Sequence, residues 1–409
     1  MPLAVLILLM VLIAIALRHL IKMTVPIWGL MTIGAVASIL FQQISPLHAL
    51  SAIEPDVMFY LFGMFLICQA AEESGYLERI TDRIFFHAIT GKHALLVIVF
   101  VLGFSAALLM NDTIAIVGTP IILQLCKSQK HVTKPLLFAL AFAITIGSVI
   151  SPIGNPQNLL IAVKGGLSSP FLDFMKPLII PTVINLIVTY FFIYFIYKHT
   201  LNKPIEKPVP GPMTHYPMII LVKISLVLML FLVFAKIITD MMHTSLRINF
   251  SYIAVIAALP ILFCKQRWFL LKQLDWGTLF FFASTFILIQ SVWDSGFFQT
   301  TISQFHITVT QIPVIVFISV IFSQFISNVP LVALYLPLLM NHHAADSQYL
   351  ALAAGSTIAG NLSILGAASN VIIIQNMEKR GMKGFGFFEF IKVGVPLTAM
   401  NMLIYTWFL

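Results

Sequence analysis

One carboxylate, Asp112, lies deep inside an apolar stretch of the sequence, residues 94–125. In a membrane-embedded segment a charge at that depth is costly and is by default functional, most simply as a carrier of a proton or another cation. The alternative is structural, because Asp also favours the N-cap position of a helix. Asp112 is therefore the candidate coupling residue of this chain.

Two other apolar stretches are interrupted by polar residues in the same pattern. Thr145 to Asn158 and Thr357 to Asn370 both read T-I-x4-S-x2-G-x3-N. A helix broken at such a point leaves free N–H and C=O groups, which lipid cannot satisfy. The pattern predicts a small polar site near the middle of the membrane. The alternative is that these small polar residues only join helices together.

The stretches 94–125 and 310–340 share a second pattern, because Asn111 and Asn328 each precede a proline by nine residues. We expect both stretches to be helical hairpins whose tips lie at these asparagines. Hairpin tips and helix breaks together predict a site of amides and hydroxyls. The candidate solute-binding residues are Asn111, Thr113, Ser148, Ser151, Asn155, Asn158, Asn328, Ser363, Ser369 and Asn370.

Several functions are disfavoured by residues that are missing from these positions. Neither break and neither tip contains Arg or Lys, so a fixed cation for a di- or tricarboxylate is absent. There is no P-loop motif for a built-in ATPase. Cys68, Cys126 and Cys264 are far apart and form no metal-binding pattern. We expect no catalytic residues, no metal and no cofactor, and a chain that is not an enzyme.

The composition indicates what holds these residues in place. Of 409 residues, 60% are hydrophobic and only 9% are charged, and the mean hydropathy is +1.00. A soluble domain is about 25% charged, so the chain is expected to be an all-α, multi-pass membrane protein. The net charge of +8 comes from basic residues in short loops. Such loops set membrane orientation, and no nucleic-acid partner is expected.

The basic loops also predict the topology. The loops on both sides of 94–125 are basic, whereas those flanking 310–340 have no Lys or Arg. By the positive-inside rule the two stretches dip into the membrane from opposite sides, as re-entrant hairpins. Each half then has five transmembrane helices, one hairpin and a broken helix at the centre. The alternative is two complete spans in each stretch.

The two halves are predicted to be inverted repeats. Besides the breaks and tips, Glu73-Ser74-Gly75-Tyr76 matches Asp294-Ser295-Gly296-Phe297, and Asp173-Phe174-Met175-Lys176 matches Glu389-Phe390-Ile391-Lys392. Repeats of this kind are typical of secondary transporters. The expected division is a first repeat over 1–197, a proline-rich cytoplasmic linker over 198–217 and a second repeat over 218–409.

At these residues the sequence resembles the ion transporter superfamily, and within it the ArsB/NhaD-type permeases. The likeness covers nearly the whole chain and includes Asn-Asp-Thr at the first tip, Ser-Asn-Val-Pro at the second and Gly-Asn-Pro-Gln-Asn in the first break. Dicarboxylate carriers of the superfamily have Ser-Asn-Thr in both breaks, which this chain lacks. The arsenite permease branch is the best match.

This resemblance implies efflux of trivalent arsenic or antimony (arsenite or antimonite) across a bacterial plasma (inner) membrane, in exchange for protons. It also implies that the transporter acts alone or with a soluble ATPase subunit as partner. Arsenous acid is an uncharged triol near neutral pH, so a site without fixed cations suits it and Asp112 would carry the coupling proton. The alternatives are a sodium/proton antiporter, a carboxylate or anion symporter, and a membrane scaffold that transports nothing.

Overall fold

The computed structural model describes residues 1–17, 25–76, 85, 90–126, 130–205, 216–242, 248–297, 300, 310–379 and 385–409. Within these residues the protein is helical, and the only β-type pairing is an isolated bridge between Thr90 and Pro204. The all-α fold predicted from composition is confirmed. Residues 206–215 of the predicted linker and several basic loop residues lie outside the described ranges, whereas 198–201 form a short helix, α12 (Lys198–Leu201).

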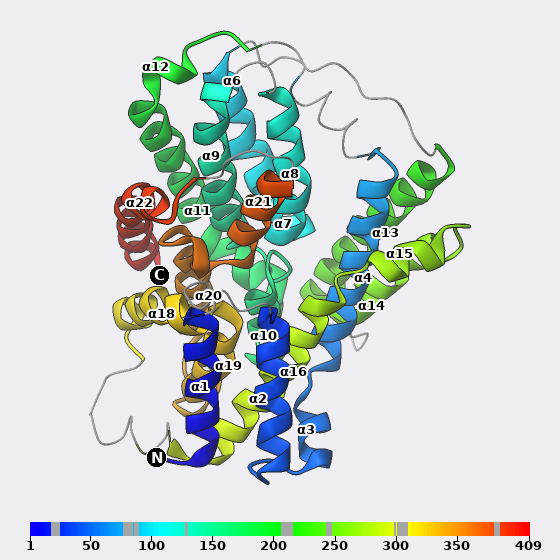
Figure 1. Cartoon of the computed structure of the whole chain (residues 1–409), viewed down its shortest axis with the longest axis vertical. Helices are drawn as coiled ribbons and strands as arrows, with labels where there is room; N and C mark the ends of the chain where they lie inside the picture. The colour runs from blue at the N-terminus through cyan, green and yellow to red at the C-terminus, as the bar shows by residue number, and fades with distance from the viewer. Residues whose placement is uncertain are drawn as a thin grey trace.

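Figure 1 shows the helices of the described residues, coloured in order along the chain. The first half contains α1 (Leu3–Leu17), α2 (Ile27–Leu40), α3 (Pro46–Ala52), α4 (Pro55–Glu73), α6 (Gly91–Leu96), the π-helical η1 (Val97–Leu102), α7 (Gly103–Leu109), α8 (Asn111–Leu125), α9 (Lys130–Ser148), α10 (Pro156–Lys164) and α11 (Pro170–Ile196). The second half contains α13 (Tyr216–Met241), α14 (Phe250–Leu262), α15 (Arg267–Gln273), α16 (Trp276–Asp294), α18 (Ile312–Ile326), α19 (Asn328–Asn341), α20 (Asp346–Ile358), the 3₁₀ turns η2 (Ala359–Asn361) and η3 (Ile364–Gly366), α21 (Ala368–Lys379) and α22 (Phe387–Phe408).

One of the repeated motifs is a helix end. Helices α4 and α16 both stop before a Ser-Gly pair, and Gly75 and Gly296 adopt φ of +71° and +69°. This left-handed conformation is one that glycine adopts without a Cβ penalty. In both places the serine hydroxyl donates to a carbonyl three residues earlier and accepts from the amide two residues later. The sequence match therefore corresponds to a matched local structure.

Each stretch that was predicted to be a hairpin consists of two helices that meet at a single residue. Helices α7 and α8 meet at Met110, and α18 and α19 meet at Ser327. Both residues have positive φ, of 66° and 69°, with extended ψ. This region is almost restricted to glycine, and a residue held there stores about 1–3 kcal/mol of strain, typically at a functional site.

Ten transmembrane helices are predicted, and helix lengths in the described residues identify fewer candidates. Among those residues six helices are long and apolar enough to cross a membrane, or seven if α3 and α4, which meet at a bend of 57°, form one span. One of the six is Gly91–Leu109, the first arm of the first hairpin. Helices α2 and α14 have only 14 and 13 residues, or about 20–21 Å at 1.5 Å per residue. The side from which each hairpin enters stays a prediction.

Helices of the first half pack against helices of the second half. Helix α14 of the second half packs on α4 of the first, and α2 of the first half packs on α16 of the second. The α4–α14 contact is close, because a Cβ at Gly63 would lie 2.6 Å from the carbonyl group of Ala254. At the centre, α10 packs on α19 and α21 packs on α8. Breaks and hairpins from opposite halves therefore meet each other.

Helices α7 and α9 cross at two glycines, Gly103 and Gly147. A Cβ at Gly147 would overlap the carbonyl oxygen of Gly103, which is backbone and cannot turn away. We expect Gly147→Ala to force the helices apart and to lower the thermal unfolding temperature of the detergent-solubilised protein by several degrees. Gly386→Ala is the control, since nothing lies near a Cβ at that position. An unchanged unfolding temperature for Gly147→Ala would contradict this account of the crossing.

Candidate functional site

The first helix break, between α9 and α10, is held together by the side chain of Asn158. Its amide nitrogen Nδ2 donates to the carbonyl oxygens of Ser148, Val149 and Ser151 at 3.0–3.3 Å. Asn155 is the N-cap of α10, and its Oδ1 accepts from the Asn158 backbone amide at 2.8 Å. Both side chains are fully buried. The polar residues of the break therefore satisfy the backbone groups that it exposes.

The second break, between α20 and α21, repeats this arrangement. Asn370 Nδ2 donates to the carbonyl oxygens of Gly360 and Ser363, at 2.6 and 3.3 Å. These acceptors precede Asn370 by ten and seven residues, as Ser148 and Ser151 precede Asn158. The motif T-I-x4-S-x2-G-x3-N thus encodes one particular loop, which its last asparagine closes.

The two breaks are joined through Thr357, at the end of α20. Its hydroxyl Oγ1 accepts from Asn155 Nδ2 at 3.1 Å and lies 3.3 Å from Gln157 Nε2. The same hydroxyl donates to Asn158 Oδ1, also at 3.3 Å. Thr357 is 1% exposed, so this junction between the halves is closed to solvent.

Each hairpin tip is attached to the break of its own half. The backbone amide of Asn111 donates to the carbonyl of Gly154 in the first break at 2.9 Å. In the second half, Gln324 lies one turn before the tip, and its Nε2 donates to the carbonyl of Ala359 at 2.8 Å. Gln324 Oε1 accepts from the Ser363 hydroxyl at 2.7 Å. Tips and breaks therefore form one central polar cluster.

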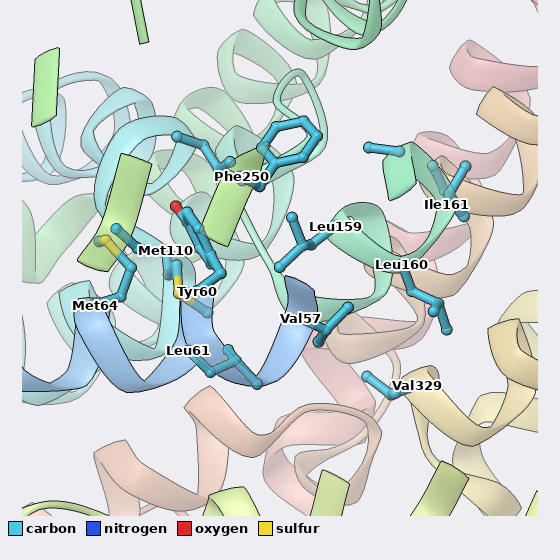
Figure 2. Packing of buried hydrophobic residues seen from close by; sticks show 14 of the residues in the cluster. Val57, Tyr60, Leu61, Met64, Met110, Leu159, Leu160, Ile161, Phe250 and Val329 are labelled. Atoms are coloured by element: carbon cyan, nitrogen blue, oxygen red, sulfur yellow. The ribbon is translucent and has the colours of Figure 1, made fainter. Parts of the chain in front are cut away.

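The second tip contacts the opposite half, and the first tip packs on α4 of its own half. Figure 2 shows Val329, at the second tip, near Leu160 of α10 and Val57 of α4. It shows Met110, at the first tip, beside Tyr60 and Met64 of α4. These buried apolar side chains belong to one hydrophobic cluster, which fixes the tips around the polar centre.

Asp112 lies in the first turn of α8 and is partly buried. Its carboxylate caps no helix: the N-cap residue of α8 is Met110, and no side chain caps that end. The backbone amide of Asp112 donates to Asn111 Oδ1 at 3.0 Å. Among the described residues no group donates a hydrogen bond to the Asp112 carboxylate. The positive end of the α8 dipole favours a negative charge there.

The structure brings most of the predicted site residues into this central cluster. Ser148, Ser151, Asn155, Asn158, Ser363, Asn370 and Asn111 are linked by hydrogen bonds within or around the two breaks. Thr113 instead lies against α4, where its hydroxyl is 2.9 Å from the Cys68 thiol. Asn328 and Ser369 lie on α19 and α21, which pack against α10 and α8.

Sequence reasoning missed Gln324 and a chain of three buried asparagines. Asn361 Nδ2 in the second break donates to Asn401 Oδ1 at 3.2 Å, and Asn401 Nδ2 donates to Asn185 Oδ1 at 2.7 Å. Asn185 and Asn401 are 216 residues apart, the same separation as Asp173 and Glu389 in the matched motif. That shared separation was the signal available in the sequence. These three asparagines link the second break to α11 and α22.

Charge and metal ligands contribute little to the centre. Lys164, at the end of α10 and outside the first break, pairs with Glu54 at 2.7 Å. Neither break and neither tip contains Lys or Arg. Within the described ranges no three His, Cys, Asp or Glu side chains are grouped as metal ligands. The centre therefore offers amide, hydroxyl and backbone groups with one carboxylate beside them.

Comparison with known proteins gives a consistent result. The model of the CitMHS family, described as citrate transporter, matches residues 4–353. An uncharacterized transporter of Mycobacterium tuberculosis is 28% identical over 387 residues, covering 87% of this chain and 86% of that protein. A Dictyostelium discoideum protein named as transporter arsB is 21% identical over 487 residues, covering 92% and 86%.

A further relative matches part of this chain, and a solved structure matches its fold. A silicon efflux transporter of rice is 32% identical over 143 residues, which are 35% of this chain and 29% of that protein. The crystal structure of the YdaH transporter of Alcanivorax borkumensis superimposes with a TM-score of 0.57 at 13% sequence identity, covering 99% of this chain and 96% of that one. The fold is therefore that of a known membrane transporter.

Proposed function

The chain belongs to the citrate transporter (CitMHS) family of membrane transporters, and from that premise we propose which solute it moves. It is a secondary active transporter that exports a small uncharged inorganic hydroxy acid, arsenous or antimonous acid, in exchange for protons. It acts as a multi-pass protein of the plasma (inner) membrane, and a soluble ATPase subunit is a candidate partner.

One observation carries this proposal: the buried polar centre is built of amides and hydroxyls, without a cationic side chain among its described residues. A buried anion with several charges needs paired positive charges, because the partial charge of a helix N-terminus is only about half a unit. A neutral triol needs only hydrogen-bond donors and acceptors, which this centre has. The names of two relatives, arsB and silicon efflux transporter, agree with such a solute, because soluble silicon is also an uncharged hydroxy acid at neutral pH.

An uncharged solute requires a separate group for coupling. Asp112 supplies one beside the centre, at the first tip, where no described residue donates to its carboxylate. A buried carboxylate is a natural proton carrier in a membrane. We propose that a proton on Asp112 crosses in one direction and the solute in the other.

Citrate symport is the second candidate, because the family is described by that substrate. A tricarboxylate would need arginine or lysine at the site, and the described centre has neither. Sodium/proton antiport would need several anionic oxygens, and Asp112 is the only carboxylate at the tips and breaks.

Everted membrane vesicles that contain the protein test the proposal. With an acid interior they should accumulate arsenite and antimonite, and a protonophore should abolish that accumulation. Citrate should neither enter nor compete, and sodium should not dissipate the pH gradient. Citrate accumulation without arsenite accumulation would contradict the proposal and favour the symporter.

A further inference from the structure

The two breaks have the same loop structure, but their asparagine oxygens differ. Asn158 Oδ1 in the first break accepts from the Thr357 hydroxyl. Asn370 Oδ1 in the second is fully buried and accepts no hydrogen bond from any described residue. Its orientation is fixed, because Nδ2 of the same amide donates to two backbone carbonyls. An acceptor that is buried without a donor costs about 1–3 kcal/mol and therefore requires an explanation.

The hairpin tips show the same difference. Asn111 Oδ1 at the first tip accepts from the backbone amide of Asp112 at 3.0 Å. Asn328 Oδ1 at the second tip is buried, and nothing in the described chain donates to it. The side-chain oxygen of the tip asparagine thus accepts a hydrogen bond in the first half and accepts none from the described residues in the second.

A third matched pair differs in the same direction. Gln157 follows the cap of the first break, and its amide reaches Thr357. The matched position, 212 residues later, is Ser369, whose side chain is too short for such a link. The Ser369 hydroxyl is fully buried and has no partner within the described residues.

The position of these three free groups indicates what they bind. Asn328 is the first residue of α19, and Ser369 and Asn370 lie in the first turn of α21. A helix N-terminus carries partial positive charge, which disfavours a metal cation and favours oxygen atoms with partial negative charge. An amide oxygen accepts hydrogen bonds only from donors. A solute that bears hydroxyl groups offers both a donor and an electron-rich oxygen.

We propose that the transported hydroxy acid binds only at the second break and second tip, where Asn328, Ser369 and Asn370 are its ligands. The first break has a structural role, because it binds Thr357 and thereby joins the two halves. This assignment rests on the proposed function and narrows its site. Asp112 lies on a neighbouring helix, because α8, which begins at the first tip, packs along α21.

Ser369→Ala tests this assignment cleanly, because it removes a hydroxyl that contacts no described polar group. In everted vesicles we expect the KM for arsenite to rise about three- to tenfold, the effect of losing one hydrogen bond. The thermal unfolding temperature should stay that of the wild type. Asn328→Ala should raise the KM in the same way.

Two control variants separate binding from structure. Ser225→Ala removes another buried hydroxyl without a described partner, but on α13, which packs on α14 and α4. It should leave both KM and stability unchanged. Gln157→Ala, at the position that matches Ser369, should lower the unfolding temperature and leave the KM unchanged.

The outcomes distinguish this assignment from the proposed function itself. If wild-type vesicles accumulate neither arsenite nor antimonite, the proposed function fails and the assignment fails with it. If they accumulate arsenite and Ser369→Ala retains the wild-type KM, only the assignment is overturned. A rise in KM for Gln157→Ala equal to that for Ser369→Ala would also overturn it, because both breaks would then bind the solute.

Discussion

Asp112→Asn should reduce pH-gradient-driven accumulation of arsenite to the level of vesicles without the protein. Asparagine keeps the size of the side chain and can still accept hydrogen bonds, but it cannot carry a proton. An uncharged solute needs no counter-charge from Asp112, so binding should persist. Exchange of labelled for unlabelled arsenite should therefore continue after coupling is lost.

The structure removes the competing explanation for Asp112. If Asp112 were the N-cap of α8, Asn would replace it with little effect, because the two residues cap about equally well. However, the N-cap position is occupied by Met110, and Asp112 lies inside the first turn without capping it. Asp112→Glu should retain partial coupling, since it keeps a carboxylate at the tip.

Asp346→Asn is the matched control, because Asp346 also lies in the first turn of a helix, α20, but is exposed. It should transport like the wild type. Flux driven by the pH gradient should be measured for all three variants at equal protein content. Wild-type accumulation by Asp112→Asn would remove this residue from the coupling mechanism.

The parts of the site that the sequence predicted are those with a strong local signal. Asparagine, proline and glycine inside an apolar stretch have few explanations other than a broken helix, and the structure has breaks at both predicted places. Gln324 carried no such signal, because a glutamine in an apolar helix is common. Thr357 opens the repeated motif, but the motif does not indicate that its hydroxyl joins the two halves. Their importance depends on partners 39 and 199 residues away, Ser363 and Asn158.

The arrangement of helices was less predictable than their order. Residues 1–197 and 218–409 are predicted to be two repeats, and this division stays a prediction. Partner choice is a tertiary property, however, and hydropathy does not record that α4 packs on α14 or α2 on α16. The sequence also does not predict that Asn158 Oδ1 accepts a hydrogen bond while Asn370 Oδ1 accepts none from the described residues, since both are asparagines at the same position of one motif.

Asn158→Leu should destabilise the protein strongly, by at least about 3 kcal/mol. The Asn158 amide donates to three buried carbonyl oxygens, and its Oδ1 accepts from Thr357. Leucine offers no donor, and water has little access to this fully buried position. The carbonyls of Ser148 and Ser151 keep a backbone donor each, so losing their bonds to Asn158, and the bond from Thr357, costs about 0.5–1.5 kcal/mol each. The Val149 carbonyl keeps no described donor, which costs about 1–3 kcal/mol more. Thermal unfolding of the purified protein in detergent, followed by its monodispersity in size-exclusion chromatography, measures the loss.

The control variant Asn202→Leu shows whether the loss of stability comes from the helix break or from any asparagine-to-leucine change. Asn202 is exposed, and its Oδ1 is only 3.4 Å from the Tyr194 hydroxyl, so this variant should unfold at the wild-type temperature. The two roles considered for Asn158 predict opposite results. If Asn158 binds the solute, Asn158→Leu should be stable but should not transport. If Asn158 only supports the structure, the variant should be unstable, and its surviving fraction should bind arsenite with the wild-type KM. A stable, inactive Asn158→Leu would therefore place the solute at the first break instead of the second.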